Sequence, residues 1–167
     1  CVTGVQTCAL PIYEHWEAHR KLEPHWKECW KGIQTEGVIS VEAGTLLSQY
    51  AYYLREQGRY AEAEPLHTEA LGLSRQLLPK GHPLIIVGIN NLAYLREGQG
   101  RYAEAEPLYN EALESMVKVL GREHPNTQTV LQNLILCYVV QEKMAEVAWI
   151  MEQYPEIILS LLQNESP

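Results

Sequence analysis

The chain has 167 residues, 46% of them hydrophobic, so it is long enough to bury a continuous core and too apolar for a disordered segment. Its 21 acidic residues, all of them Glu, outnumber the 13 basic ones and give a net charge of -8. This balance argues against nucleic acid or an anionic membrane as the main partner. The four Cys residues have no disulfide-framework spacing, which favours a reducing, cytoplasmic setting.

The first twelve residues, CVTGVQTCALPI, carry no charge and share no pattern with the rest of the chain. Read back into codons, Val2 to Ile12 fits a run that resembles a common sequencing-adapter oligonucleotide. We therefore expect residues 1–12 to be a translated artefact without ordered structure, and the remainder to be a fragment whose upstream sequence is missing. The alternative, a signal peptide, lacks a basic leader and has too short an apolar core.

Residues 13–41 form the next segment. Trp16, Trp26 and Trp30 lie mostly at helical spacing, so we predict one or two helices that cap the following part of the chain.

This segment also carries His and Cys residues at spacings that place pairs on one helical face and that zinc can use. Its HWEAH stretch differs from the metalloprotease signature because the Glu is third rather than second. The alternative is a helix with its histidines outward and its tryptophans inward, and on that interpretation we predict no metal and no cofactor. The residues concerned are His15, His19, His25 and Cys29.

An internal repeat dominates the rest of the chain. Residues 57–71 and 99–113 share QGRYAEAEPL and EAL and differ only at the two positions between these stretches. The same shift of 42 residues lays a third, decayed copy over residues 141–150. Self-similarity of this kind indicates repeats that stack on one another, since one copy cannot bury both of its faces.

Glycine and proline mark the helix boundaries within each copy. Gly98 and Gly100 interrupt an apolar-periodic stretch, and the next helix is predicted to start at about Tyr102. His-Pro dipeptides recur at 82–83 and 124–125, which indicates a structural role for the two histidines and a helix start at each proline.

This pattern resembles the tetratricopeptide repeat, in the 42-residue form typical of kinesin light chains and of many bacterial signalling proteins. The likeness is carried by INNLAYL (89–95), GQGRYAEAEPLYNEAL (98–113) and VLGREHPNTQTVLQNL (119–134). It implies an all-α fold, a right-handed α-solenoid of stacked antiparallel helix hairpins with helical caps at both ends. The expected divisions are repeats at about 42–83 and 84–125, a degenerate repeat at 126–154, and a C-terminal helix and tail at 155–167.

The resemblance also implies where a ligand would bind. In this family the first helix of each hairpin lines a concave face that holds extended peptides, and an Asn pair in the NNLA motif bonds the peptide main chain, since an amide offers both a donor and an acceptor. The alternative is that Asn91 and Asn133 tie adjacent hairpins together. The positions expected to contact a protein or peptide ligand are Asn90, Asn91, Gln132, Asn133, Gln49, Tyr52, Tyr94, Arg55 and Glu97.

No catalytic set can be assembled from this sequence. The chain has no Asp and no nucleophile elbow. Cys137 lies in an apolar run that is typical of a core residue, and Glu104 and Glu106 suggest a solvated helix face. We therefore predict that the chain is not an enzyme.

The predicted function is a protein–protein interaction module. Residues 13–41, with the AGxLLxQxAYYL pattern that follows them, are similar to the stretch between the ATPase core and the repeats of bacterial STAND-type regulatory ATPases. That likeness implies a fragment of a larger bacterial regulatory protein. The alternative is a structural segment without a peptide ligand that self-associates through the ends of the solenoid, helped by an apolar helix at 155–163.

Overall fold

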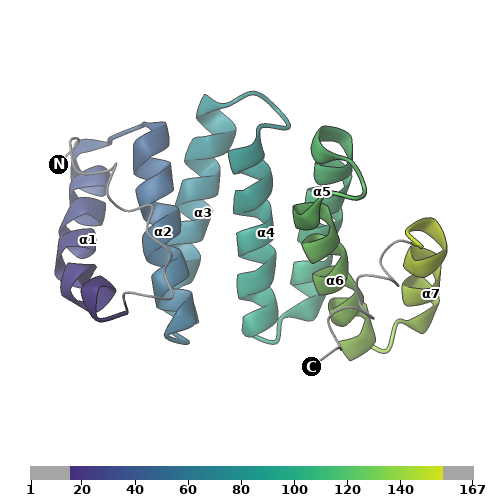
Figure 1. The fold of residues 1–167 in the computed structure, drawn as a ribbon. Helices are drawn as coiled ribbons and strands as arrows, with labels where there is room; N and C mark the ends of the chain where they lie inside the picture. The colour runs from purple at the N-terminus through teal and green to yellow at the C-terminus, as the bar shows by residue number, and fades with distance from the viewer. Residues whose placement is uncertain (1–15, 156–167) are drawn as a thin grey trace. The chain divides into compact units, whose positions relative to one another are not determined.

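The computed structural model describes residues 16–155, which form seven α-helices and no strand (Figure 1). The predicted all-α fold is therefore confirmed, while residues 1–12 and the C-terminal segment from residue 156 lie outside the described part. The chain divides into two compact units, residues 1–78 and 79–167, which are described separately. The helices are α1 (Trp16–Glu36), α2 (Val41–Glu56) and α3 (Tyr60–Leu77) in the first unit, and α4 (Pro83–Gly98), α5 (Tyr102–Leu120), α6 (Pro125–Val140) and α7 (Met144–Gln153) in the second.

The core of the first unit is the hairpin of α2 and α3, which pack against each other. Leu47, Leu54 and Leu66 are fully buried there. Helix α2 begins after Ser40, whose Oγ accepts a hydrogen bond from a backbone amide of the first turn at 3.1 Å. The hairpin turns at Gly58, whose φ of 71° is a conformation that glycine adopts without steric cost.

Helix α1 covers α2 through an aromatic cluster. The Trp26 side chain is 3% exposed, and its ring centroid lies 5.4 Å from that of Tyr50 and 5.2 Å from that of Tyr53. Trp30 donates from Nε1 to the Glu69 carboxylate of α3 at 3.1 Å. Residues 13–41, which were predicted to contain one or two helices, thus form the single helix α1 within the described part, and its Trp26 and Trp30 side chains contact α2 and α3, as the periodicity indicated.

The second unit contains two hairpins, α4–α5 and α6–α7. Helix α6 packs on α5 and also contacts α4, and α7 packs on α6. The first hairpin turns at Gly100, with a φ of 74°. The second has Glu142 at the equivalent position with a φ of 58°, so the third copy keeps the turn but not its glycine.

The His-Pro dipeptides begin the first helix of each hairpin in this unit. His82 and His124 occupy the N-cap positions, and their Nδ1 atoms accept hydrogen bonds from the amides of Leu84 at 3.2 Å and Asn126 at 3.1 Å. The prolines that follow need no donor partner in the first turn. The predicted structural role of these histidines is confirmed.

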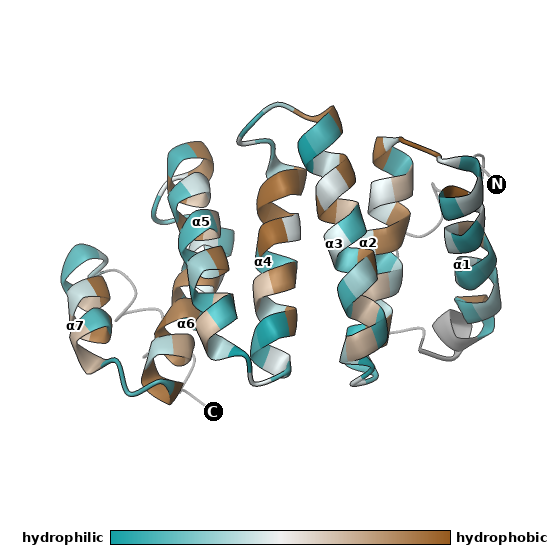
Figure 2. Ribbon diagram, turned by 180° about the vertical axis from the view of Figure 1, so that it is seen from behind, coloured by the Kyte–Doolittle hydropathy of each residue, from teal (hydrophilic) through white to brown (hydrophobic). Residues whose placement is uncertain are grey.

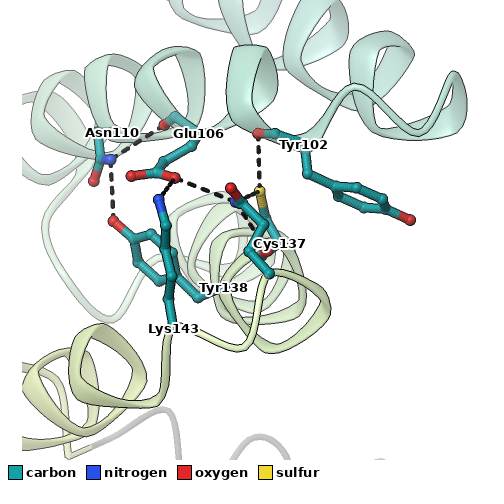
Figure 3. A network of polar contacts seen from close by, with 7 residues as sticks. Tyr102, Glu106, Asn110, Cys137, Tyr138 and Lys143 are labelled. Carbon is teal, nitrogen blue, oxygen red and sulfur yellow. Dashed lines mark hydrogen bonds and ion pairs between the residues drawn. The ribbon is translucent and has the colours of Figure 1, made fainter.

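A polar network fastens α5 to α6 and to the turn before α7 (Figure 3). Glu106 of α5 accepts hydrogen bonds from Lys143 at 2.5 Å and from the Gln141 side chain at 3.2 Å. Asn110, one turn further along α5, donates to the Tyr138 hydroxyl at 3.2 Å. The interpretation of Glu106 as part of a solvated face was wrong, because its carboxylate is half-buried between three elements.

Candidate functional site

The first wall of the candidate site is one face of α4. Val87, Asn90, Asn91 and Tyr94 lie at spacings of three and four residues, so they share that face. The two amides are half-buried, while Val87 and Tyr94 are each 42% exposed. The opposite side of α4 is buried in the hairpin, with Ile85, Ile89, Leu92 and Leu95 each at most 9% exposed.

The second wall is the corresponding face of α6, the helix that contacts α4. Gln132 and Asn133 are half-buried there, and Leu136 is 50% exposed. We call the surface formed by Val87, Asn90, Asn91 and Tyr94 of α4 with Gln132, Asn133 and Leu136 of α6 the amide face.

The hydrogen bonding of these amides bears directly on their role. The side chains of Asn91 and Asn133 make no hydrogen bond to another residue in the described part of the chain, whereas Gln132 is engaged. The Oδ1 atom of Asn90 is buried and accepts no hydrogen bond from any described residue. The alternative role for Asn91 and Asn133, a polar tie between hairpins, thus has no hydrogen bond to support it within the described residues.

Glu97, which was expected on the same face one turn beyond Tyr94, is directed toward α5. Its carboxylate accepts a short hydrogen bond from the hydroxyl of Tyr109, a residue with no exposed surface. Burial raises the pKa of Glu97 above its ordinary value, and the hydrogen bond from Tyr109 opposes that rise. Burial together with the neighbouring carboxylate raises the pKa of Tyr109, which keeps its hydroxyl protonated as a donor.

The remaining candidate residues belong to α2 in the first unit. Gln49 and Tyr52 are half-buried and lie three residues apart. Arg55 is 8% exposed; its guanidinium carbon lies 4.3 Å from the centre of the Tyr52 ring, and its Nη2 lies 2.8 Å from the Glu56 carboxylate. The charge of Arg55 is therefore already compensated within its own unit.

Two residues of the amide face were not among the predicted positions. Val87 and Leu136 were treated as ordinary apolar residues, yet both stand exposed beside the amides. Leu136 could have been predicted from the repeat, because it occupies the position that Tyr52 and Tyr94 occupy in the other two copies.

Other chemical groups of the described residues do not assemble into a site. The Cys29 Sγ lies 3.6 Å from His25 Nε2, but no group of three or more metal-ligating side chains occurs between residues 16 and 155. His15 and His19 lie outside the part whose side chains are described. Cys137 is fully buried, as predicted, and burial raises the pKa of its thiol to about 11.

A surface cavity of about 580 Å³ lies along α5 rather than on the amide face. Its lining contains no residue of α4 or α6, and its one cationic side chain, Lys143, is paired with Glu106. It is lined by Ala103, Glu106, Pro107, Asn110, Glu111, Glu114 and Lys143. No helix in the described part of the chain has the length and apolarity that crossing a membrane requires.

Comparison with solved structures finds helical-repeat proteins. BtubC (BKLC) from P. vanneervenii is 22% identical with a TM-score of 0.70; the alignment covers 83% of this chain and 55% of that one, so this chain spans about half of its length. The putative kinesin light chain of Podosopora anserina, with nearly identical TPR-like repeats, is 20% identical with a TM-score of 0.70 and covers 93% of this chain and 79% of that one. A substituted form of the Podosopora protein gives a TM-score of 0.71 at 20% identity, over 93% of this chain and 78% of that one.

At the level of sequence, comparison with curated proteins finds no match. The family model described as "Tetratricopeptide repeat" matches twice, over residues 42–115 and 84–146. These matches cover more than half of the chain, and they span helices α2 to α6 and the first residues of α7. The chain belongs to the tetratricopeptide-repeat family.

Proposed function

We propose that the chain is a protein-interaction module that binds an extended peptide segment of a partner on the amide face. The observation that carries the proposal is the pair of half-buried amides, Asn91 on α4 and Asn133 on α6, that make no hydrogen bond to another described residue. Each amide can donate to a peptide carbonyl and accept from a peptide N–H, and an extended main chain has both groups unpaired. A face built from two helices is small, so we expect a dissociation constant in the micromolar range, about 10⁻⁶ M.

The proposed role is binding rather than catalysis. The amide face contains amides, one phenol and aliphatic side chains, and it has no carboxylate, imidazole, amine or thiol group. It therefore offers no general acid or base and no activated nucleophile. Enzyme activity is accordingly not part of the proposed function.

We further propose that the chain is part of a larger bacterial regulatory protein that works in the cytoplasm. The likeness of residues 13–41 to the stretch before the repeats of bacterial regulatory ATPases supports the first part. The free thiols of Cys29 and Cys137 are consistent with a reducing compartment. The excess of Glu supports a protein or peptide partner rather than nucleic acid or a membrane.

One observation favours a second candidate, self-association through α7. Met144 and Trp149 of this helix are 54% and 57% exposed, and Trp149 is the most exposed large apolar side chain among the described residues. A second copy stacked on α7 would cover them. Analytical ultracentrifugation over a range of concentrations, with Trp149→Glu as the disrupting variant, distinguishes a dimer from a monomer that binds peptide.

The test of the amide face begins with peptides selected from a random displayed library on the intact chain. We expect the double variant Asn91→Ala and Asn133→Ala to weaken the selected peptides by about tenfold or more, because both main-chain partners are lost. Gln76→Ala, at an exposed amide of α3, is the matched control and should leave affinity unchanged. If the double variant keeps its helical circular dichroism and still binds with full affinity, the amide face is not the binding site.

A further inference from the structure

The amide face is uncharged in a chain that carries a net charge of -8. All sixteen residues of α6 lack charge. Helix α4 has two charged residues, Arg96 and Glu97, both at its C-terminal end. Figure 2 shows a related contrast in hydropathy: α4 is largely brown and pale, whereas α1 is largely teal.

Both charged residues of α4 are engaged with α5. Arg96 lies 3.7 Å from the Glu104 carboxylate, and Glu97 accepts the hydrogen bond of Tyr109. Two charged residues precede α6 in the chain. Glu123 is exposed, and Arg122 donates to the backbone carbonyl of Gln153 at 2.9 Å and lies over the Tyr154 ring. Arg96, Glu97 and Arg122 are thus directed to other partners in the second unit.

Exposed apolar side chains flank the amides on this surface. Val87, Tyr94 and Leu136 are between 42% and 50% exposed, and they alternate along the two helices with the half-buried Asn and Gln residues. On such a surface, a peptide binds most favourably when its apolar side chains are buried and its main chain is hydrogen-bonded to the amides. A charged ligand side chain buried here would lose its hydration and find no counter-ion, which disfavours binding.

We propose that the amide face selects an uncharged, apolar, extended segment of a partner protein, and rejects acidic and basic segments alike. This inference rests on the proposed function of the same face. Asn91 and Asn133 pair with the main chain of the segment, while Val87, Tyr94 and Leu136 contact its side chains. Affinity is then almost independent of salt, because no ion pair forms across the interface.

The test uses three labelled peptide pools of equal length: one of Leu, Val, Ala, Tyr and Ser, one with Glu at alternate positions, and one with Lys there. Fluorescence anisotropy with the intact chain should show binding of the neutral pool, at least about tenfold weaker binding of both charged pools, and little change at high salt.

Charge variants of the face provide a matched gain of function. Leu136→Lys places a cation at a half-exposed position, so it should move the preference toward the Glu pool and make binding salt-sensitive. Leu136→Glu should move the preference toward the Lys pool and also make binding salt-sensitive. Val119→Lys, at an exposed apolar residue of α5, is the control and should change neither the preference among the pools nor the salt dependence.

The outcomes separate the two proposals. Salt-sensitive preference for the Glu or the Lys pool, lost with Asn91→Ala and Asn133→Ala, overturns the inference of an uncharged ligand and leaves the binding face in place. Absence of binding by all three pools overturns both. Neutral-pool binding that survives the double Asn variant overturns the assignment to this face.

Discussion

The hydroxyl of Tyr109 donates a hydrogen bond to the Glu97 carboxylate, and this contact joins α5 to α4 inside the second unit. In the preceding copy of the repeat, the same two positions hold His67 and Arg55. There, both ring nitrogens of His67 are buried without a hydrogen-bond partner. The second copy thus pairs a phenol with a carboxylate. In the first copy, the positive charge of Arg55 disfavours protonation of the His67 imidazole.

The first prediction concerns the Tyr109–Glu97 contact. Tyr109→Phe leaves the half-buried Glu97 carboxylate without its donor, and we expect it to lower the free energy of unfolding by about 1–3 kcal/mol. Urea unfolding followed by circular dichroism measures the change. Tyr102→Phe is the control, since no hydrogen bond of its hydroxyl occurs in the described part of the chain; equal effects of the two substitutions would contradict the assigned role.

The second prediction concerns pH. Burial, and to a lesser extent the charge of Arg55, lowers the pKa of His67 to about 4 from an ordinary 6.5. Between these values the unfolded chain takes up a proton that the folded chain does not, so the free energy of unfolding falls as the pH falls through this window. The loss reaches at most about 3 kcal/mol and is complete below pH 4.

Comparison with His67→Tyr, the residue of the second copy, isolates this contribution from those of the carboxylates. The stability of the wild-type chain relative to this variant should decline steadily between pH 6.5 and pH 4. Parallel pH curves for the two proteins would show that His67 titrates normally in the folded state.

The third prediction concerns the turn before α7. Glu142 has a φ of 58°, where its counterparts in the other two hairpins are Gly58 and Gly100. Glu142→Gly should stabilise the second unit by about 1 kcal/mol, because glycine adopts this conformation without the steric cost of a Cβ. Glu142→Ala keeps the Cβ and should give no such gain in thermal unfolding; a gain from alanine would assign the effect to the charge instead.

The fourth prediction concerns thiol reactivity. Cys137 is fully buried with a pKa of about 11, so little thiolate forms near pH 8, and the sulfur is also inaccessible. Cys29 is partly exposed on α1. Brief iodoacetamide treatment followed by peptide mass mapping should label Cys29 in the folded chain and Cys137 only in denaturant. Equal labelling in the folded state would show that α6 opens readily.

Much of the helix pattern could be predicted from local features. Tyr102 and Pro125 were predicted to begin helices, and both do, because Gly and Pro act on the backbone of their own turn. The inward positions of Trp26 and Trp30 on α1 followed from helical spacing. Of the candidate site, the amides of α4 and α6 lie where the periodicity puts them, on one face of each helix.

Other features depended on contacts between helices. Glu97 lies one turn beyond Tyr94 on α4, but its partner, Tyr109, is on α5, and the packing of the α4–α5 hairpin brings the two together. Glu106 looks like a surface residue in sequence, yet Lys143 and Gln141 reach it from the next hairpin. Periodicity gives the direction of a side chain from its own helix, and it carries no information about which helix lies opposite.

The sequence by itself therefore determined that this chain consists of paired helices in repeated copies, because propensity, proline and glycine effects and the 42-residue period act within each copy. The tertiary structure decided which polar side chains form hydrogen bonds inside the units and which do not. Glu97 is paired across a hairpin, whereas Asn91 and Asn133 make no hydrogen bond to another described residue. The physical reason is that the burial and the hydrogen bonding of a polar side chain depend on residues distant in sequence, which only the packing of the helices brings close.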